Sequence, residues 1–207
     1  MLSGEPIRDS DALIGEYDLE ASALAIPSDR GLLVKGMFFH RHVEILGSEW
    51  ERVLPTLAEP PRGGRYLAFS DYHSGDYVRV SGRAARKRYP GVGSCEALRR
   101  LAREDFDVFA MSTLGRVILS VISDARGALH KTPFVYEKLA PGDWRVVVTD
   151  LDERTSRVEF TPFYGRWEYA LGQIEGLVLH YRPTSVVRVS ELADRIRFEV
   201  EHRSRST

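Results

Sequence analysis

The chain has 207 residues, of which 43% are hydrophobic and 10% aromatic, enough to bury the core of one domain. Because 29 Lys and Arg face 30 Asp and Glu, the formal charge of -1 argues against nucleic acid as a partner. No apolar run approaches the roughly 20 residues of a membrane-spanning helix, so we expect no membrane insertion. One cysteine permits no intrachain disulfide, and the acidic N-terminus lacks a secretory signal; both favour a cytoplasmic protein.

Residues 1–12 and 203–207 lack the patterns of regular structure. The first segment is rich in Gly, Pro, Ser and Asp, which predicts a flexible lead-in, and the last predicts a polar tail. No internal repeat or low-complexity tract lies between them. We therefore expect a single domain over residues 13–202.

Residues 35–57 carry apolar side chains at helical spacing. The spacing is interrupted at Gly47 and stops near Pro55, so it predicts one helix followed by a short second one. The turn-forming letters PPRGG at 60–64 then predict a loop.

A helix with two distinct stripes is predicted up to residue 89. Small and apolar side chains recur at helical intervals at Val78, Gly82, Ala85 and Tyr89. A neighbouring stripe is formed by Arg79, Arg83 and Arg86. We expect the first stripe to face the core and the arginines to face water or a partner. Pro90 ends the helix, because proline disfavours helical backbone in the preceding residue.

Three further segments have helical or apolar character. Ser94 is a good N-cap for a helix that continues to residue 105. Residues 106–123 are apolar around the whole circumference of a helix, so we expect them in the interior. Residues 124–142 predict another helix, cut or bent at Pro133.

From residue 143 the pattern changes period. Residues 144–163 are dense in β-branched and aromatic side chains around a polar turn, which predicts a hairpin. A helical stretch at 169–181 precedes two strand candidates, 185–192 and 194–202. The order predicts an α+β fold in which N-terminal helices pack on a C-terminal antiparallel sheet of about four strands, with one crossing helix.

Three stretches carry a resemblance to a known family: DLEASALAIPSDRGLLVKGMFF, DYVRVSGRAARKRYPGVGSCEALRRLARED and LGQIEGLVLHYRPTSVVRV. In order and spacing they resemble an uncharacterised family of paralogous proteins found in myxobacteria. The resemblance covers about residues 16–202 and rests on several short pieces. The family is of unknown function, and its layout is similar to the 4-vinyl reductase and haem-NO-binding group, in which helices pack on one antiparallel sheet.

The resemblance also bears on cofactors and partners. Haem-binding members of that wider group use a Tyr-x-Ser-x-Arg motif and an iron-binding histidine. This chain has no Tyr-x-Ser-x-Arg motif, so the resemblance implies no haem cofactor. Other relatives take an apolar ligand or dimerise into larger assemblies, and both possibilities stay open here.

The arginine stripe is the sharpest chemical feature of the sequence. Arg79, Arg83 and Arg86 could clamp a phosphate or an acidic partner through forked guanidinium contacts. The alternative is an ordinary solvated helix face, which the nearby Asp71 and Asp76 favour. No interleaved aromatic residues accompany the arginines, as single-stranded nucleic acid would require.

Other reactive groups do not form a recognisable site. The segment PGVGS at 90–94 follows a predicted helix and lacks the lysine of a phosphate loop, so a plain turn is favoured. His40 and His42 would point about 200° apart on a helix and cannot share a metal. Cys95 follows a helix cap, which can lower a thiol pKa, but no base is near it in sequence. We expect it to be buried and inert.

The junction after the first hairpin is unusually aromatic, with Phe160, Phe163, Tyr164, Trp167 and Tyr169 in ten residues. Core packing explains such density, and so does an interface or an apolar ligand pocket, because Tyr and Trp suit sites with one wet end.

These observations favour a non-enzymatic binding or assembly module, dimeric, that takes part in bacterial signalling or protein–protein interaction. We expect no catalytic residue, metal or cofactor. The candidate binding residues are Arg79, Arg83, Arg86, Phe163, Tyr164, Trp167 and Tyr169. The alternative is a small-molecule sensor that holds an apolar or anionic ligand between the helices and the sheet.

Overall fold

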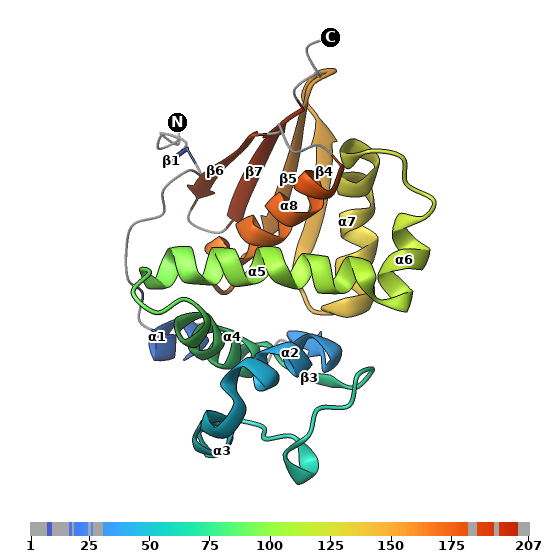
Figure 1. The fold of residues 1–207 in the computed structure, drawn as a ribbon. Helices are drawn as coiled ribbons and strands as arrows, with labels where there is room; N and C mark the ends of the chain where they lie inside the picture. Colours follow the sequence, from blue (N-terminus) through green and yellow to red (C-terminus); the bar gives the residue numbers. More distant parts are fainter. Residues whose placement is uncertain are drawn as a thin grey trace.

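The computed structural model describes residues 8–9, 17, 19–24, 26, 31–181, 186–192 and 195–202. Figure 1 shows a sheet formed by the C-terminal part of the chain, with helices against it and the N-terminal helices beneath them. Helices therefore come first in the sequence and the sheet comes last. The predicted α+β fold is confirmed.

The first part of the chain contains short helices and a two-stranded ribbon. Its elements are α1 (Leu19–Leu24), β2 (Leu33–Lys35), α2 (Met37–Leu46), α3 (Trp50–Val53), β3 (Asp71–His73) and α4 (Ser74–Arg88), with 3-10 turns at Gly47–Glu49, Leu54–Thr56 and Arg62–Gly64. Gly47 ends α2 with a φ of 50°, a conformation that glycine adopts without steric cost. The interrupted helix predicted for 35–57 is confirmed.

Three helices follow: α5 (Ser94–Met111), α6 (Thr113–Leu119) and α7 (Ala125–Leu139). The predicted end of α4 before Pro90 is confirmed, and α7 continues through Pro133. The prediction that residues 106–123 lie in the interior is wrong. This segment forms the end of α5 and α6, at the edge of the molecule (Figure 1), and its exposed apolar side chains are Val108, Met111, Val117 and Val121.

The sheet consists of β4 (Arg145–Asp150), β5 (Thr155–Thr161), β6 (Val186–Leu192) and β7 (Arg195–Glu201), with β1 (Arg8–Asp9) added at its edge. The strand order is β1-β6-β7-β5-β4, and all neighbours are antiparallel. Every second residue of β5 and β7 is buried, so Val158 and Phe198, which pair across the strands, belong to the core. Between β5 and β6 the chain forms α8 (Trp167–Tyr181), which confirms the predicted crossing helix.

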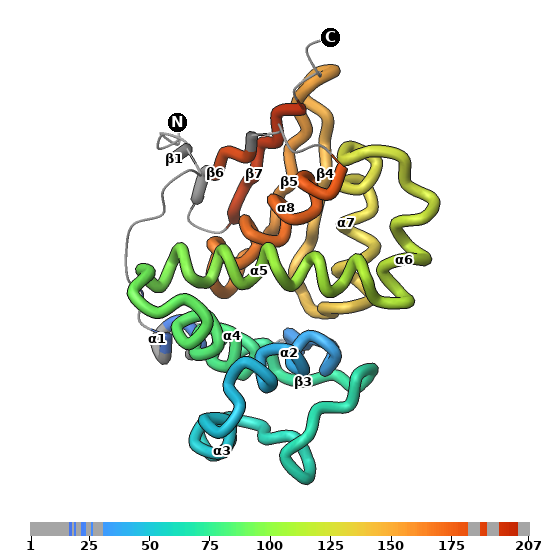
Figure 2. The backbone as a smooth tube through the Cα atoms, viewed as in Figure 1, coloured from blue at the N-terminus to red at the C-terminus, as the bar shows by residue number. Residues whose placement is uncertain are grey.

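α5 lies across the molecule between the sheet side and the N-terminal helices, as Figure 2 shows. It packs closely on α8, because two residues of α8 in the contact are glycines. A Cβ atom added at Gly172 would overlap the backbone of Arg99, and one added at Gly176 would press on Phe106. The close approach therefore depends on both glycines.

The ends of the chain are only partly described. Arg8–Asp9 is the part of the predicted lead-in that the structure describes, and residues 203–207 lie outside the described residues. The flexible ends and the single domain over 13–202 therefore stay predictions. Within the described ranges, no helix is long and apolar enough to cross a membrane.

Candidate functional site

The three arginines of α4 do not form one water-facing stripe. Arg79 is buried, and its guanidinium lies 3.1 Å from Asp76 Oδ1. Asp76 also accepts hydrogen bonds from the backbone N–H groups of Ala58, at 2.8 Å, and Glu59, at 2.9 Å. The expectation that Arg79 faces water is therefore wrong. Asp76, its partner, also binds the segment that follows α3, so this segment lies against the side of α4 that carries the ion pair.

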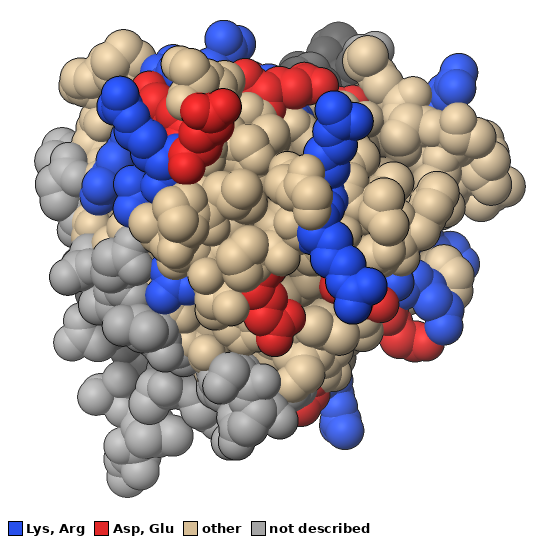
Figure 3. Space-filling view, turned by 90° about the horizontal axis from the view of Figure 1, so that it is seen from below, with Lys and Arg blue, Asp and Glu red and all other residues tan. Residues whose placement is uncertain are grey.

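The other two arginines have different surroundings. Arg86 is exposed and donates hydrogen bonds to Ser94 Oγ and to the carbonyl oxygen of Tyr17, both at 3.3 Å, whereas Arg83 is half-buried. Figure 3, a view from the side of the N-terminal helices, shows Lys and Arg in several separate groups with Asp and Glu among them. The structure thus does not bring the arginines together as a single anion clamp.

The aromatic junction between β5 and α8 borders a cavity of about 140 Å³. Three of the candidate residues, Phe163, Tyr164 and Tyr169, line this cavity. Trp167 is not among its lining residues and packs, half-buried, against the core. The helices contribute Tyr77, Val78 and Ser81 from α4, Val135, Tyr136 and Leu139 from α7, and Ala170 and Gln173 from α8. We call this space the inner cavity.

One hydroxyl group in the wall of the inner cavity has no hydrogen-bond partner among the described residues. The side chain of Ser74, at the start of α4, is 5% exposed and lines the cavity. Its hydroxyl makes no hydrogen bond within the described part of the chain. The cap of α4 is supplied instead by His73, whose Nδ1 accepts from the N–H of Gly75 at 3.2 Å. Sequence reasoning missed Ser74, because a serine at a helix start is normally read as part of the cap.

A chain of buried hydrogen bonds leads away from the inner cavity. Tyr169 donates to Asp105 Oδ2 at 2.7 Å, and the same oxygen lies 2.7 Å from His42 Nε2. Because Tyr169 uses its proton for Asp105, Tyr77 donates the hydrogen bond that joins the two hydroxyls. Burial raises the pKa of Tyr77 and of Tyr169 well above the usual value, so both stay protonated at neutral pH.

A second cavity of about 90 Å³ adjoins the first. Its walls come from α5, α6, α7 and α8, with Phe38 from α2, and its lining includes Asp105, which takes part in the buried hydrogen-bond chain. The residues that line both cavities are Phe38, Val135, Tyr136, Leu139 and Gln173. Tyr136 donates to Gln173 Oε1 at 2.7 Å, so this hydrogen bond ties α7 to α8 in the partition between the cavities.

The remaining candidates have structural surroundings. Cys95 is buried, and burial, followed by the neighbouring Glu168, raises the pKa of its thiol to about 12, although Arg166 acts in the opposite direction. A thiol with that pKa is not a nucleophile at neutral pH. His40 contacts the carbonyl oxygen of Tyr66 at 2.9 Å. No group of three metal-binding side chains occurs in the described ranges.

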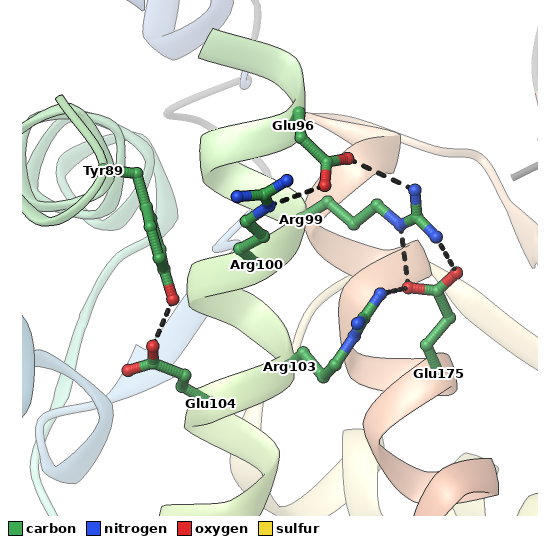
Figure 4. Close-up of polar contacts among 7 residues, drawn as sticks. All are labelled: Tyr89, Glu96, Arg99, Arg100, Arg103, Glu104 and Glu175. Carbon is green, nitrogen blue, oxygen red and sulfur yellow. Dashed lines mark hydrogen bonds and ion pairs between the residues drawn. The ribbon is translucent and has the colours of Figure 1, made fainter. Parts of the chain in front are cut away.

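Ion pairs hold the wall of the inner cavity in place (Figure 4). On α8, Glu175 accepts hydrogen bonds from Arg99 at 2.6 and 2.8 Å and from Arg103 at 2.6 Å. Arg99 also lies 3.2 Å from Glu96 on its own helix, and Tyr89 at the end of α4 donates to Glu104. α5 is thereby bonded to α8, which carries Tyr169, and to the end of α4, the helix that carries Tyr77.

Sequence comparison now places the chain among known proteins. A family model described as "Protein of unknown function (DUF2378)" matches residues 30–201. The chain belongs to the DUF2378 family. This confirms the resemblance to a family of unknown function. A search of curated proteins finds no match to the chain.

Solved structures similar to this DUF2378 protein are H-NOX domains. An Fe(II) unliganded H-NOX protein from K. algicida is 15% identical, with a TM-score of 0.62, over 84% of this chain and 98% of that one. An H-NOX protein from S. oneidensis in the Fe(II)NO ligation state is 12% identical, with a TM-score of 0.63, over 82% and 99%. At such identities the likeness shows the fold alone. It confirms the layout expected from the haem-NO-binding group.

Proposed function

We propose that this DUF2378 protein is a non-enzymatic, cytoplasmic small-molecule sensor that holds an apolar ligand in the inner cavity. The observation that carries the proposal is the aromatic cavity with the unpartnered hydroxyl of Ser74 in its wall. Buried polar groups are nearly always hydrogen-bonded, and because the Ser74 hydroxyl borders the cavity, a ligand there would supply the partner that it lacks. The fold analogy with H-NOX proteins supports the sensor class, but only as an analogy.

The size of the cavity limits the ligand. A volume of about 140 Å³ is close to that of an engineered protein cavity, about 150 Å³, that binds benzene. Aromatic rings pack well against the edges and faces of Phe160, Phe163 and Tyr169. We therefore propose a ligand part of about one ring, with one group that hydrogen-bonds to Ser74.

The buried chain of hydrogen bonds supplies a route for the signal. Tyr77 and Tyr169 line the cavity, and Asp105 and His42 connect them to α5 and α2. A ligand that moves Tyr169 changes the partner of a buried carboxylate, which is costly to leave unpaired. A ligand in the inner cavity would thus change the hydrogen bonding of His42 on α2, on the far side of α5.

The cavity does not fit haem, although the neighbours include structures that address haem distortion. Protein ligands to haem iron are His, Cys, Met or Tyr, and the described residues that line the two cavities include no His, Cys or Met. Burial raises the pKa of Tyr77, Tyr136 and Tyr169, which disfavours their phenolate forms. A space that suits one benzene ring is also too small for a porphyrin.

Binding of phenol and benzene tests the proposal by isothermal titration calorimetry. We expect phenol to bind more tightly, because its hydroxyl pairs with Ser74, and Ser74→Ala to remove that advantage of about 1 kcal/mol while leaving benzene binding unchanged. Ala170→Leu, which fills the cavity, should abolish binding of both.

The matched control is Ser120→Ala, because Ser120 is exposed after the end of α6, away from the cavity lining, and its hydroxyl donates to the carbonyl oxygen of Val117. It should leave both affinities unchanged. Equal binding by wild type and Ala170→Leu would show that the ligand lies elsewhere and would overturn the proposal.

An assembly module is the second candidate function, and an exposed apolar surface favours it. Val108 and Met111 of α5 and Val117 and Val121 at α6 are 46%, 75%, 64% and 81% exposed. Large apolar side chains exposed on two successive helices favour a protein interaction site. We propose that two copies of the chain associate through it.

Light scattering over micromolar concentrations tests the assembly proposal. The wild type should have the mass of a dimer, and the double variant Val117→Glu, Val121→Glu should be monomeric. Leu67→Glu changes a side chain that is 66% exposed elsewhere and should remain dimeric. A wild type that stays monomeric at every concentration would refute the assembly proposal.

A further inference from the structure

An outer groove meets the inner cavity at α7. The groove has a volume of about 390 Å³ and lies between the end of α7 and the start of β4. Three of its lining residues, Tyr136, Ala140 and Trp144, also line the inner cavity. Tyr136 further lines the second cavity, so all three spaces meet at its side chain. The groove and the inner cavity are therefore separated by a small number of side chains.

Three aromatic side chains pack against one another between the groove and the inner cavity. The ring of Tyr136 meets the edge of Trp144, with centroids 5.8 Å apart, and the edge of Phe160, with centroids 5.1 Å apart. The indole N–H of Trp144 donates to the carbonyl oxygen of Ala140 at 2.7 Å, which holds the indole between the groove and the inner cavity. The hydroxyl of Tyr136 is held in this partition by one hydrogen bond, to Gln173, so rotation of Tyr136 would cost that bond.

The groove carries an unused positive charge. Arg145, the first residue of β4, lines the groove and is exposed. Among the residues that the structure describes, its guanidinium has no hydrogen bond or ion pair. The carboxylate in the same lining belongs to Glu137, which is already paired with Lys138 at 2.6 Å. An anionic group in the groove would therefore gain Arg145 as a partner.

We infer that the ligand is an amphipathic carboxylate, with an aromatic ring and the group that hydrogen-bonds to Ser74 in the inner cavity, and with its carboxylate in the outer groove against Arg145. The inference rests on the proposed function and specifies its ligand class. The chain that joins ring and carboxylate passes Tyr136 and Trp144. Guanidinium binds carboxylate through two parallel N–H donors, so Arg145 also orients the ligand with its ring inward.

A matched pair of probes tests the inference: 3-phenylpropanoate and the neutral 3-phenylpropan-1-ol. Trp144 lies at the junction, so its fluorescence should report binding of both, and Trp144→Phe should lose that signal. At low salt we expect the acid to bind about fivefold more tightly than the alcohol, as for a partly exposed ion pair. High salt should reduce the difference.

The decisive variant is Arg145→Gln, which should weaken the acid about fivefold and leave the alcohol unchanged. Arg52→Gln removes the same charge from an exposed arginine on α3 that has no ion pair with any residue in the described ranges, and it should affect neither probe. If the alcohol binds but the acid has no advantage, or keeps it in Arg145→Gln, this inference is overturned and the proposed function stands. If neither probe binds although phenol does, this inference is overturned and the proposed function stands; if phenol also fails to bind, both are overturned.

Discussion

The two sides of α8 are built in different ways. Towards α5, Gly172 and Gly176 bring the helices together and Glu175 binds two arginines, so this side has little freedom to rearrange. Towards α7 and β5, Ala170 and Gln173 border two cavities. The face of α8 towards α5 therefore fixes the position of the helix, and the face towards α7 and β5 borders empty space. A ligand site needs both, because a cavity keeps its shape only when one of its walls is held rigidly.

The largest effect that this contrast predicts comes from Glu175→Gln. The change removes the carboxylate that accepts two hydrogen bonds from the buried guanidinium of Arg99 and leaves it with Glu96 alone, which should lower the free energy of unfolding by about 3 kcal/mol. Urea denaturation measures it. Glu199→Gln, in a half-exposed pair with Arg157, is the control and should cost at most about 1 kcal/mol. If Glu175→Gln and Glu199→Gln lowered the free energy of unfolding equally, the ion pairs between α5 and α8 would be as accessible to water as the surface pair.

Gly172→Ala should have the next largest effect. The added methyl group overlaps the carbonyl oxygen of Arg99, so the helices must separate, at a cost of about 2 kcal/mol in unfolding free energy. At Gly127 of α7, an added Cβ would lie 3.4 Å from Asp124 Oδ1 and 3.5 Å from Ile122 Cγ2, which are ordinary contacts. Gly127→Ala should therefore be neutral or stabilising by up to about 1 kcal/mol. A neutral Gly172→Ala would refute the close packing.

Tyr136→Phe, on the open side of α8, should have the smallest effect on stability. It removes the hydrogen bond to Gln173 and should cost about 1 kcal/mol by urea denaturation. It should also speed the binding of phenol in stopped-flow fluorescence, because the side chain at position 136 can then rotate without breaking that bond. Tyr66→Phe removes a buried hydroxyl that has no hydrogen bond within the described ranges and should change neither quantity. Unchanged binding kinetics in Tyr136→Phe would place the access path elsewhere.

Much of the fold could be predicted, because helix and strand periods are local properties of the chain. The end of α4 before Pro90, the hairpin of β4 and β5, and the last two strands all followed from spacing and turn residues. Apolar composition alone misplaced residues 106–123, since it cannot show whether another element covers a helix. Arg79 was misplaced for the opposite reason: the chain around Ala58 covers a side of α4 that periodicity assigns to water.

The candidate site was predictable only in part. The aromatic density after β5 pointed to Phe163, Tyr164 and Tyr169, which do line the cavity. Nothing in the sequence marked Ser74 or Gln173, because a lone serine or glutamine has no spacing pattern of its own.

The sequence by itself determined the elements of this protein, their order and the aromatic character of one junction, since these depend on neighbours within a few residues. Only the tertiary structure decided which side chains share a cavity and which charges are buried. Those properties depend on the packing of α4, α5, α7 and α8, whose residues lie far apart along the chain. Burial then fixes the chemistry, because a hydroxyl or guanidinium without water must find its partner in the fold or in a ligand.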